Sequence, residues 1–208
     1  MSATSGTKPA TAPERAWQRM LSGRRLDLLE PSPGDIEIAD IAHGLARVAR
    51  WNGQTTGAHA FSVAQHSLIV TDIFEALNPA SSNAYRRAAL LHDAPEYVIG
   101  DLISPFKAAI GFDYKAFEYR LLAAIHRRFE IPADMPDAVT NAIKIADRVA
   151  AFYEATHLAG FSLEEAQIFF AHFEVPQALA QKLETIEPIS AKDAQQNFLS
   201  RFEALAHL

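Results

Sequence analysis

Apolar residues recur at intervals of three and four positions through most of this chain, and no segment alternates convincingly between apolar and polar residues as a half-buried strand would. Prolines, glycines and asparagines interrupt this pattern and mark the ends of its segments. The segments expected to be helical are 14–21, 38–50, 61–77, 83–98, 114–129 and 137–157. Two short sequences, Ser162–Glu165 and Ser190–Asp193, resemble capping boxes, and each predicts the start of one further helix. The pattern therefore predicts an all-α fold in the form of a single helical bundle.

The composition limits the classes to which the protein can belong. Residues 1–13 are small and polar and are expected to form a flexible tail, whereas residues 14–208 are expected to fold as one domain. The net charge of −6 argues against nucleic-acid binding, which needs a basic surface, but it permits a small anionic substrate. Because the chain has no cysteine, a metal ion would have to use histidine and carboxylate ligands.

The sequence lacks the signals that direct a chain into or across a membrane. It contains no run of about 18 apolar residues, and its first residues lack the continuous apolar segment of a signal peptide. We therefore expect no membrane association and a cytoplasmic location. The oligomeric state is left open, with a homodimer as one candidate.

One short apolar stretch combines an adjacent His92-Asp93 pair with Glu96 and Asp101. On a helix, His92 and Asp93 project about 100° apart, so both can reach a point beside the helix. A divalent cation at that point would accept an imidazole nitrogen and a carboxylate oxygen. Glu96 follows the pair at i+4 and i+3 and overhangs the same region. Pro95 lacks a backbone N–H, so the helix is expected to be weakened or kinked here.

Two residues on other predicted helices offer further ligands for the same ion. His66 has apolar neighbours at i−3, i+3, i+4 and i+7, and Asp147 lies among apolar residues, where a carboxylate is costly unless it is paired or binds metal. Alone, such a histidine is more often a hydrogen-bonded core residue, and such an aspartate more often caps a helix or pairs with an arginine. Their occurrence together with His92 and Asp93 favours a metal site between helices of a bundle. Two imidazoles and two carboxylates would leave an octahedral ion two open positions, for water and for a substrate oxygen.

Four residues of this chain, in the order His66, His92, Asp93 and Asp147, resemble the metal signature of the HD-domain phosphohydrolases. The resemblance covers about residues 38–158 and leaves the helices expected in 161–208 outside it. Within that superfamily, the sequence is most similar to bacterial 5′-deoxynucleotidases and to phage-type deoxynucleoside triphosphate hydrolases. Those proteins carry an arginine and an aromatic residue ahead of the first histidine, as Arg50 and Trp51 stand here.

The resemblance implies roles for several more residues. Glu96 and Asp101 would be catalytic acids, with Glu96 orienting or deprotonating the attacking water and Asp101 protonating the leaving alkoxide. Without the histidines, they would be explained equally well as an exposed helical acid and a turn residue. The contacts to the nucleotide would come from Arg50, Trp51 and Lys107. Considered as a residue alone, Trp51 is nearly as well explained by core packing as by stacking on a base.

The expected cofactor is one divalent metal ion, and the ligands do not distinguish Mn, Co, Mg, Zn, Fe and Ni. The expected activity is hydrolysis of the phosphate ester of a nucleotide, a deoxynucleoside 5′-monophosphate. A triphosphate carries about four negative charges and usually needs more lysines and arginines than the motif region offers. Two alternatives stay open: a deoxynucleoside triphosphate triphosphohydrolase, and a non-catalytic metal-binding helical regulatory domain.

Overall fold

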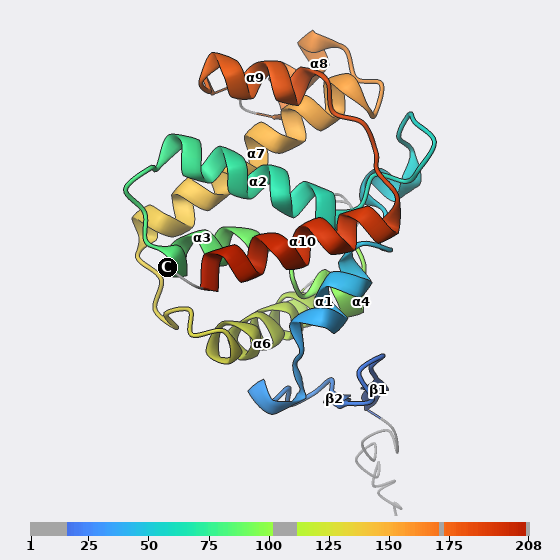
Figure 1. Ribbon diagram of the computed structural model, residues 1–208, viewed down its shortest axis with the longest axis vertical. Coiled ribbons are helices and arrows are strands. Elements are labelled where there is room, and N and C mark those ends of the chain that lie inside the picture. Colours follow the sequence, from blue (N-terminus) through green and yellow to red (C-terminus); the bar gives the residue numbers. More distant parts are fainter. Residues whose placement is uncertain (1–15, 102–111, 171–172, 207–208) are drawn as a thin grey trace, which may run out of the picture.

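A computed structural model gives the fold and describes residues 16–101, 112–170 and 173–206 (Figure 1). The long helices are α2 (Val63–Leu77), α6 (Phe112–Arg128), α7 (Asp137–His157) and α10 (Ala191–Ala206). The shorter ones are α1 (Ile38–Leu45), α3 (Asn83–Leu90), α4 (Glu96–Ile99), α8 (Leu163–Phe169) and α9 (Gln177–Glu184), and two 3-10 turns are η1 (Pro33–Asp35) and η2 (Arg50–Gly53). The predicted all-α fold is confirmed. Within the described ranges, none of these helices combines the length and the apolar character that a membrane crossing requires.

Helix α2 lies at the centre of the bundle and packs against α7, α3 and α10 (Figure 1). Helix α1 packs on α4 and α10, while α8 and α9 both contact α7 at the opposite end of the molecule. The buried apolar side chains form two clusters, and α2 contributes Val63 to the first and Val70 to the second. Helix α3 likewise contributes Leu90 and Ala89 to different clusters. The first turn of α2 and the end of α3 therefore lie where the two clusters meet.

The segment 14–21, predicted to be helical, instead contains strand β1 (Trp17–Arg19), which pairs antiparallel with β2 (Arg25–Asp27). Its prediction as a helix was wrong for two physical reasons. Gly23 adopts a φ of +88° in the connecting turn, a conformation that glycine reaches without strain. In addition, the buried carboxylate of Asp40 accepts hydrogen bonds from the N–H and hydroxyl of Ser22, which fastens the turn to α1.

The helix predicted over 83–98 is interrupted, as the proline suggested. Helix α3 ends at Leu90, α4 begins at Glu96, and the residues between them form a turn that carries His92 and Asp93. Gly100, at a φ of +77°, ends α4. Similarly, the segment expected to continue to residue 50 breaks after Leu45, and Trp51 and Asn52 in η2 have left-handed backbone conformations.

The C-terminal helices begin where their capping sequences predict. The Ser162 hydroxyl accepts the N–H of Glu165 (3.2 Å), and the Glu165 carboxylate accepts the N–H of Ser162 (2.9 Å). At the start of α10, the hydroxyl of Ser190 accepts the N–H of Asp193 (3.1 Å). Helix α9 lies between them and has no capping box, and for this reason its start could not be predicted from a capping sequence.

The close packing of α1 on α4 depends on the missing side chain of Gly44. A Cβ atom at this position would lie 2.7 Å from the Cβ of Tyr97 and 2.9 Å from its carbonyl oxygen. Because part of this contact is with backbone, α4 would have to move. We expect Gly44→Ala to lower the free energy of unfolding by about 1–3 kcal/mol, despite the higher helix propensity of alanine, as measured by urea denaturation.

Gly34→Ala is the matched control for this prediction. The added Cβ would meet only the Ser32 hydroxyl oxygen, at 3.7 Å, so the free energy of unfolding should change by less than about 0.5 kcal/mol. Equal stabilities of the Gly34 and Gly44 variants would contradict a tight contact between α1 and α4.

Candidate metal centre

His66 lies in the first turn of α2, where it is completely buried. Ser62 caps this helix by accepting a hydrogen bond from the N–H of Gln65 (3.2 Å), which sets the start of the turn. The imidazole Nδ1 lies 2.5 Å from Oε1 of Glu154 on α7. Since a carboxylate accepts, Nδ1 carries the proton, and in the neutral imidazole the opposite ring nitrogen, Nε2, presents a lone pair.

His92 presents the same ring nitrogen to the same region. Its Nδ1 lies 2.9 Å from the carbonyl oxygen of Ala89 and donates to it, which leaves Nε2 as an acceptor. The rings of His66 and His92 have centroids 5.3 Å apart. Both Nε2 atoms are buried, and neither has a hydrogen-bond partner in the described part of the chain. Such a pair of buried acceptors calls for a ligand that accepts their lone pairs.

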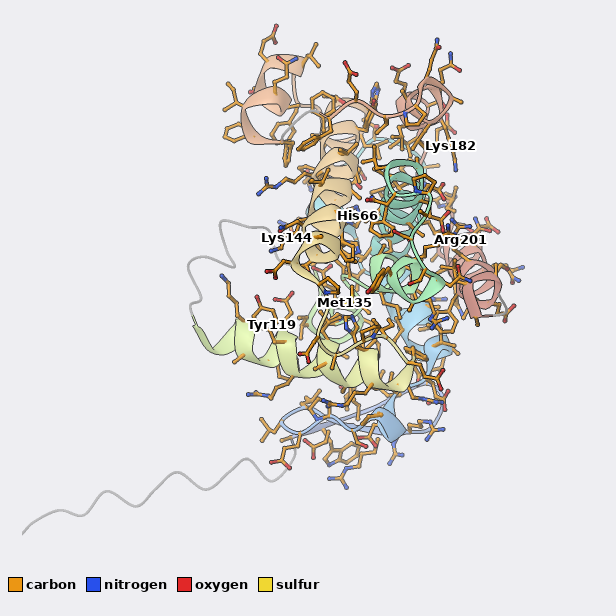
Figure 2. The ribbon with its side chains drawn as sticks, turned by 90° about the vertical axis from the view of Figure 1, so that its left-hand side faces the viewer. His66, Tyr119, Met135, Lys144, Lys182 and Arg201 are labelled. Atoms are coloured by element: carbon orange, nitrogen blue, oxygen red, sulfur yellow. The ribbon has the colours of Figure 1, made fainter. Side chains whose placement is uncertain are left out.

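Two carboxylates reach the same point. The two Nε2 atoms and one carboxylate oxygen of Asp147 all lie within 4.8 Å of one another. Asp147 Oδ1 is 3.2 Å from Nε2 of His66 and 4.0 Å from that of His92, and Asp93 Oδ2 is 3.5 and 3.2 Å from the same two atoms. Figure 2 shows His66 inside the bundle, between α2 and α7. The structure thus brings together all four predicted ligands, from α2, the α3–α4 turn and α7.

The chemistry and spacing of these atoms fit a divalent cation. Bonds of about 2.1 Å to nitrogen and oxygen ligands separate neighbouring ligand atoms by about 3.0–3.4 Å, close to most of the distances found here. Two imidazole nitrogens and two carboxylate oxygens suit several first-row transition metals. The side chain of Asp147 is 40% exposed, so the centre opens toward solvent on this side.

Glu154 is a further residue of this site that the sequence analysis missed. It is completely buried on α7, two turns after Asp147, and each of its oxygens accepts hydrogen bonds. Oε1 accepts from His66, while Oε2 accepts from Nε1 of Trp51 (2.9 Å) and from Nη2 (3.3 Å) and Nε (3.4 Å) of Arg50. The spacing of seven residues from Asp147, which puts both carboxylates on one helix face, is the signal that could have found it.

Carboxylates dominate the electrostatics of the centre. Burial lowers the pKa of Arg50, but the charges of Glu154, Asp93, Asp101 and Asp147 raise it by more, so its guanidinium stays charged. Burial by itself would raise the pKa of Glu154, whereas His66, Arg50 and the hydrogen bonds lower it to about 2. Four carboxylates thus surround one guanidinium, and a bound cation would offset the excess negative charge.

The two predicted catalytic acids lie at opposite ends of α4. Glu96 is its first residue, directly after the turn that carries His92 and Asp93, and only 1% of it is exposed. It is therefore not the exposed helical acid that the alternative interpretation required. Asp101 follows the helix, and its carboxylate lies 3.8 Å from Nη1 of Arg50, as does that of Asp93. Their catalytic roles stay predictions.

The residues predicted to contact the substrate differ in what the structure shows of them. The indole of Trp51 packs against Phe161 and Phe170, with ring centroids 5.6 and 5.7 Å away, and donates its N–H to Glu154. This environment accounts for Trp51 as a packing residue, and contact with a base stays a prediction. Lys107 lies outside the described residues.

Comparison with known proteins identifies the family. A protein of Rhodobacter capsulatus whose name describes it as uncharacterized is 62% identical over 157 residues, which are 76% of this chain and 80% of that protein. Residues 58–151 match the HD domain, and this range contains all four predicted metal ligands. The chain contains an HD domain. Members of the HD superfamily are typically phosphohydrolases that bind divalent metals, in agreement with the geometry of the centre. Similarity to the 5′-deoxynucleotidases in particular stays a prediction.

Proposed function

We propose that this HD-domain protein is a metal-dependent phosphohydrolase that cleaves the phosphate ester of a deoxynucleoside 5′-monophosphate. The observation that carries the proposal is the pair of buried Nε2 atoms, of His66 and His92, that face two carboxylates and have no hydrogen-bond partner among the described residues. A closed structural site would use up all its ligand positions. Here the exposed side of Asp147 leaves room for a substrate.

The residues around the centre have distinct tasks in this proposal. A divalent ion bound by His66, His92, Asp93 and Asp147 would lower the pKa of water and polarise a phosphoryl oxygen. Glu96, buried beside the ligand turn, orients the attacking water and takes its proton. Asp101, at the other end of α4, gives a proton to the leaving 5′-oxygen. Arg50, between Asp93 and Asp101, is placed to contact an oxygen of the phosphate.

The balance of charge supports a monophosphate over a triphosphate. Arg50 is already surrounded by four carboxylates, so little of its positive charge is left to offset a substrate with about four negative charges. The nearest cations on α7 are Lys144 and Arg148, which flank Asp147 in sequence, and both are exposed. A substrate with one phosphate requires fewer cations.

Separate incubations with dAMP and dATP test this proposal. In the presence of Mn²⁺ or Co²⁺ we expect orthophosphate and deoxyadenosine from dAMP, measured by chromatography of the nucleoside and a phosphate assay. Tripolyphosphate from dATP with dAMP left intact would instead identify a triphosphohydrolase. No hydrolysis of either nucleotide or of a generic phosphate ester, by protein that has bound metal, would favour a regulatory domain.

A further inference from the structure

The carboxylate of Glu154 is the most deeply placed charge of the centre, and it is not one of the atoms that would contact the ion. Burial of a carboxylate is costly, and an apolar residue at this position of α7 would avoid that cost. Each oxygen of Glu154 nevertheless has donors of its own, His66 on Oε1 and both Arg50 and Trp51 on Oε2. This division of donors indicates a task beyond packing.

We propose that Glu154 is a positioning residue, which holds His66 in the tautomer that faces the metal and orients Arg50 toward the acids of the centre. The inference rests on the proposed metal centre and names the residue that prepares it. Glu154 does not touch the reacting atoms, so it is not a catalytic residue.

The tautomer of His66 has two competing states. With its proton on Nδ1, held by Glu154, Nε2 is free to bind a cation. With its proton on Nε2, the ring could donate to Asp147 at 3.2 Å or to Asp93 at 3.5 Å, and the lone pair would be lost to the ion. Because both acceptors are near, the competing state is accessible, and Glu154 is the group that opposes it.

The second oxygen of Glu154 acts on Arg50. This oxygen, Oε2, accepts hydrogen bonds from Nε and Nη2 of Arg50, which lie along one edge of the guanidinium. The remaining nitrogen, Nη1, then lies 3.8 Å from the carboxylates of both Asp93 and Asp101. Since the guanidinium is planar and rigid, holding one edge sets the direction of the other.

Glu154→Gln is the most informative variant because it preserves shape and removes the charge. An amide has one oxygen and one NH₂ group, so it cannot accept on both sides. The charged Arg50 and the indole N–H favour the oxygen, which turns the NH₂ group toward His66. That group would donate to Nδ1, and the imidazole proton would then move to Nε2. The variant should therefore invert the tautomer of His66.

The matched control is Asp40→Asn, which makes the same chemical change at another buried carboxylate. Asp40 is 4% exposed and accepts two hydrogen bonds from Ser22, and neither residue is one of the proposed metal ligands. Both variants lose a buried charge, so both should unfold at lower temperature than the wild type. Only Glu154→Gln should change the metal centre.

The test measures Co²⁺ affinity by titration and the His66 tautomer by ¹⁵N–¹H correlation spectra of the metal-free full chain. The spectra are recorded at alkaline pH, where the imidazole is neutral, because Glu154, Asp147 and Asp93 hold the pKa of His66 above its usual value against the opposing effect of burial. We expect the wild type to protonate Nδ1, Glu154→Gln to protonate Nε2 and bind Co²⁺ about 10–100-fold more weakly, and Asp40→Asn to match the wild type in both. Affinity within twofold of the wild type, with Nδ1 still protonated in Glu154→Gln, would overturn the inference.

Two further outcomes are also decisive. If Glu154→Gln does not fold, the wild-type spectrum alone tests the inference, because a neutral imidazole that carries its proton on Nε2 instead of Nδ1 in the metal-free wild type would overturn it. If the wild type binds no Co²⁺, the proposed metal centre is wrong. In that case the tautomers of the wild type and the variant still decide whether Glu154 sets the state of His66.

Discussion

Asp147→Ala is expected to abolish tight binding of the metal ion and to reduce phosphate release by more than about 10²-fold. Loss of a group that only supports a ligand typically costs 10–100-fold in metal affinity or activity, so loss of a ligand itself should cost at least as much. The side chain is 40% exposed, so its removal leaves no closed cavity, and alanine suits the middle of α7. Elemental analysis after reconstitution measures the metal, and a phosphate assay measures turnover.

Asp137→Ala, which removes an exposed acid at the start of the same helix, is the control for this experiment. It should retain full metal content and full activity. Circular dichroism should show the same helix content in both variants, because neither change removes buried apolar surface. A full complement of metal in Asp147→Ala would exclude Asp147 from the centre.

Glu96→Gln is expected to keep the metal and the fold while lowering turnover by about 10²-fold or more, as for loss of a general acid or base. Glu96 is 1% exposed, so glutamine is preferable to alanine, which would leave a cavity beside the ligand turn. The effect should appear in kcat, because the amide preserves the shape of the site but cannot take a proton. Steady-state kinetics with dAMP, on protein of known metal content, measure it.

The control for the change of charge is Glu75→Gln. Glu75 lies on α2 and pairs at 2.5 Å with Arg201 of α10, away from the centre. Its loss should cost at most about 1 kcal/mol of stability and leave kcat unchanged. Turnover of Glu96→Gln near that of the wild type at saturating substrate would show that Glu96 has no acid–base role.

Helices whose apolar periodicity continues over many residues could be predicted from the sequence. The bounds of α7 coincide with the predicted segment 137–157, and Pro95 indicated the break between α3 and α4, where His92 and Asp93 lie. The prediction of a helix over 14–21 failed because eight residues show too little periodicity to distinguish a helix from a strand and turn. The contact that fastens this turn joins Ser22 to Asp40, 18 residues away, and no local pattern indicates it.

The same distinction holds for the site. The four ligands could be proposed because each lies on the apolar face of a predicted helix and because their order resembles the metal signature of HD domains. Glu154 was missed although it shares the helix face of Asp147. Its partner Arg50 is 104 residues away, and the left-handed backbone of η2, which carries both Arg50 and Trp51, has no counterpart in a helical pattern. Tertiary contacts of this kind require the folded chain.

The most direct test of a catalytic metal centre is to titrate the metal-free full chain with Mn²⁺ or Co²⁺ while recording hydrolysis of dAMP. After removal of metal with EDTA, we expect no measurable phosphate release. Activity should return in proportion to bound ion and saturate at about one ion per chain, since a single set of two imidazoles and two carboxylates is present in the described residues. Undiminished hydrolysis by protein shown to contain no metal would contradict a catalytic metal centre.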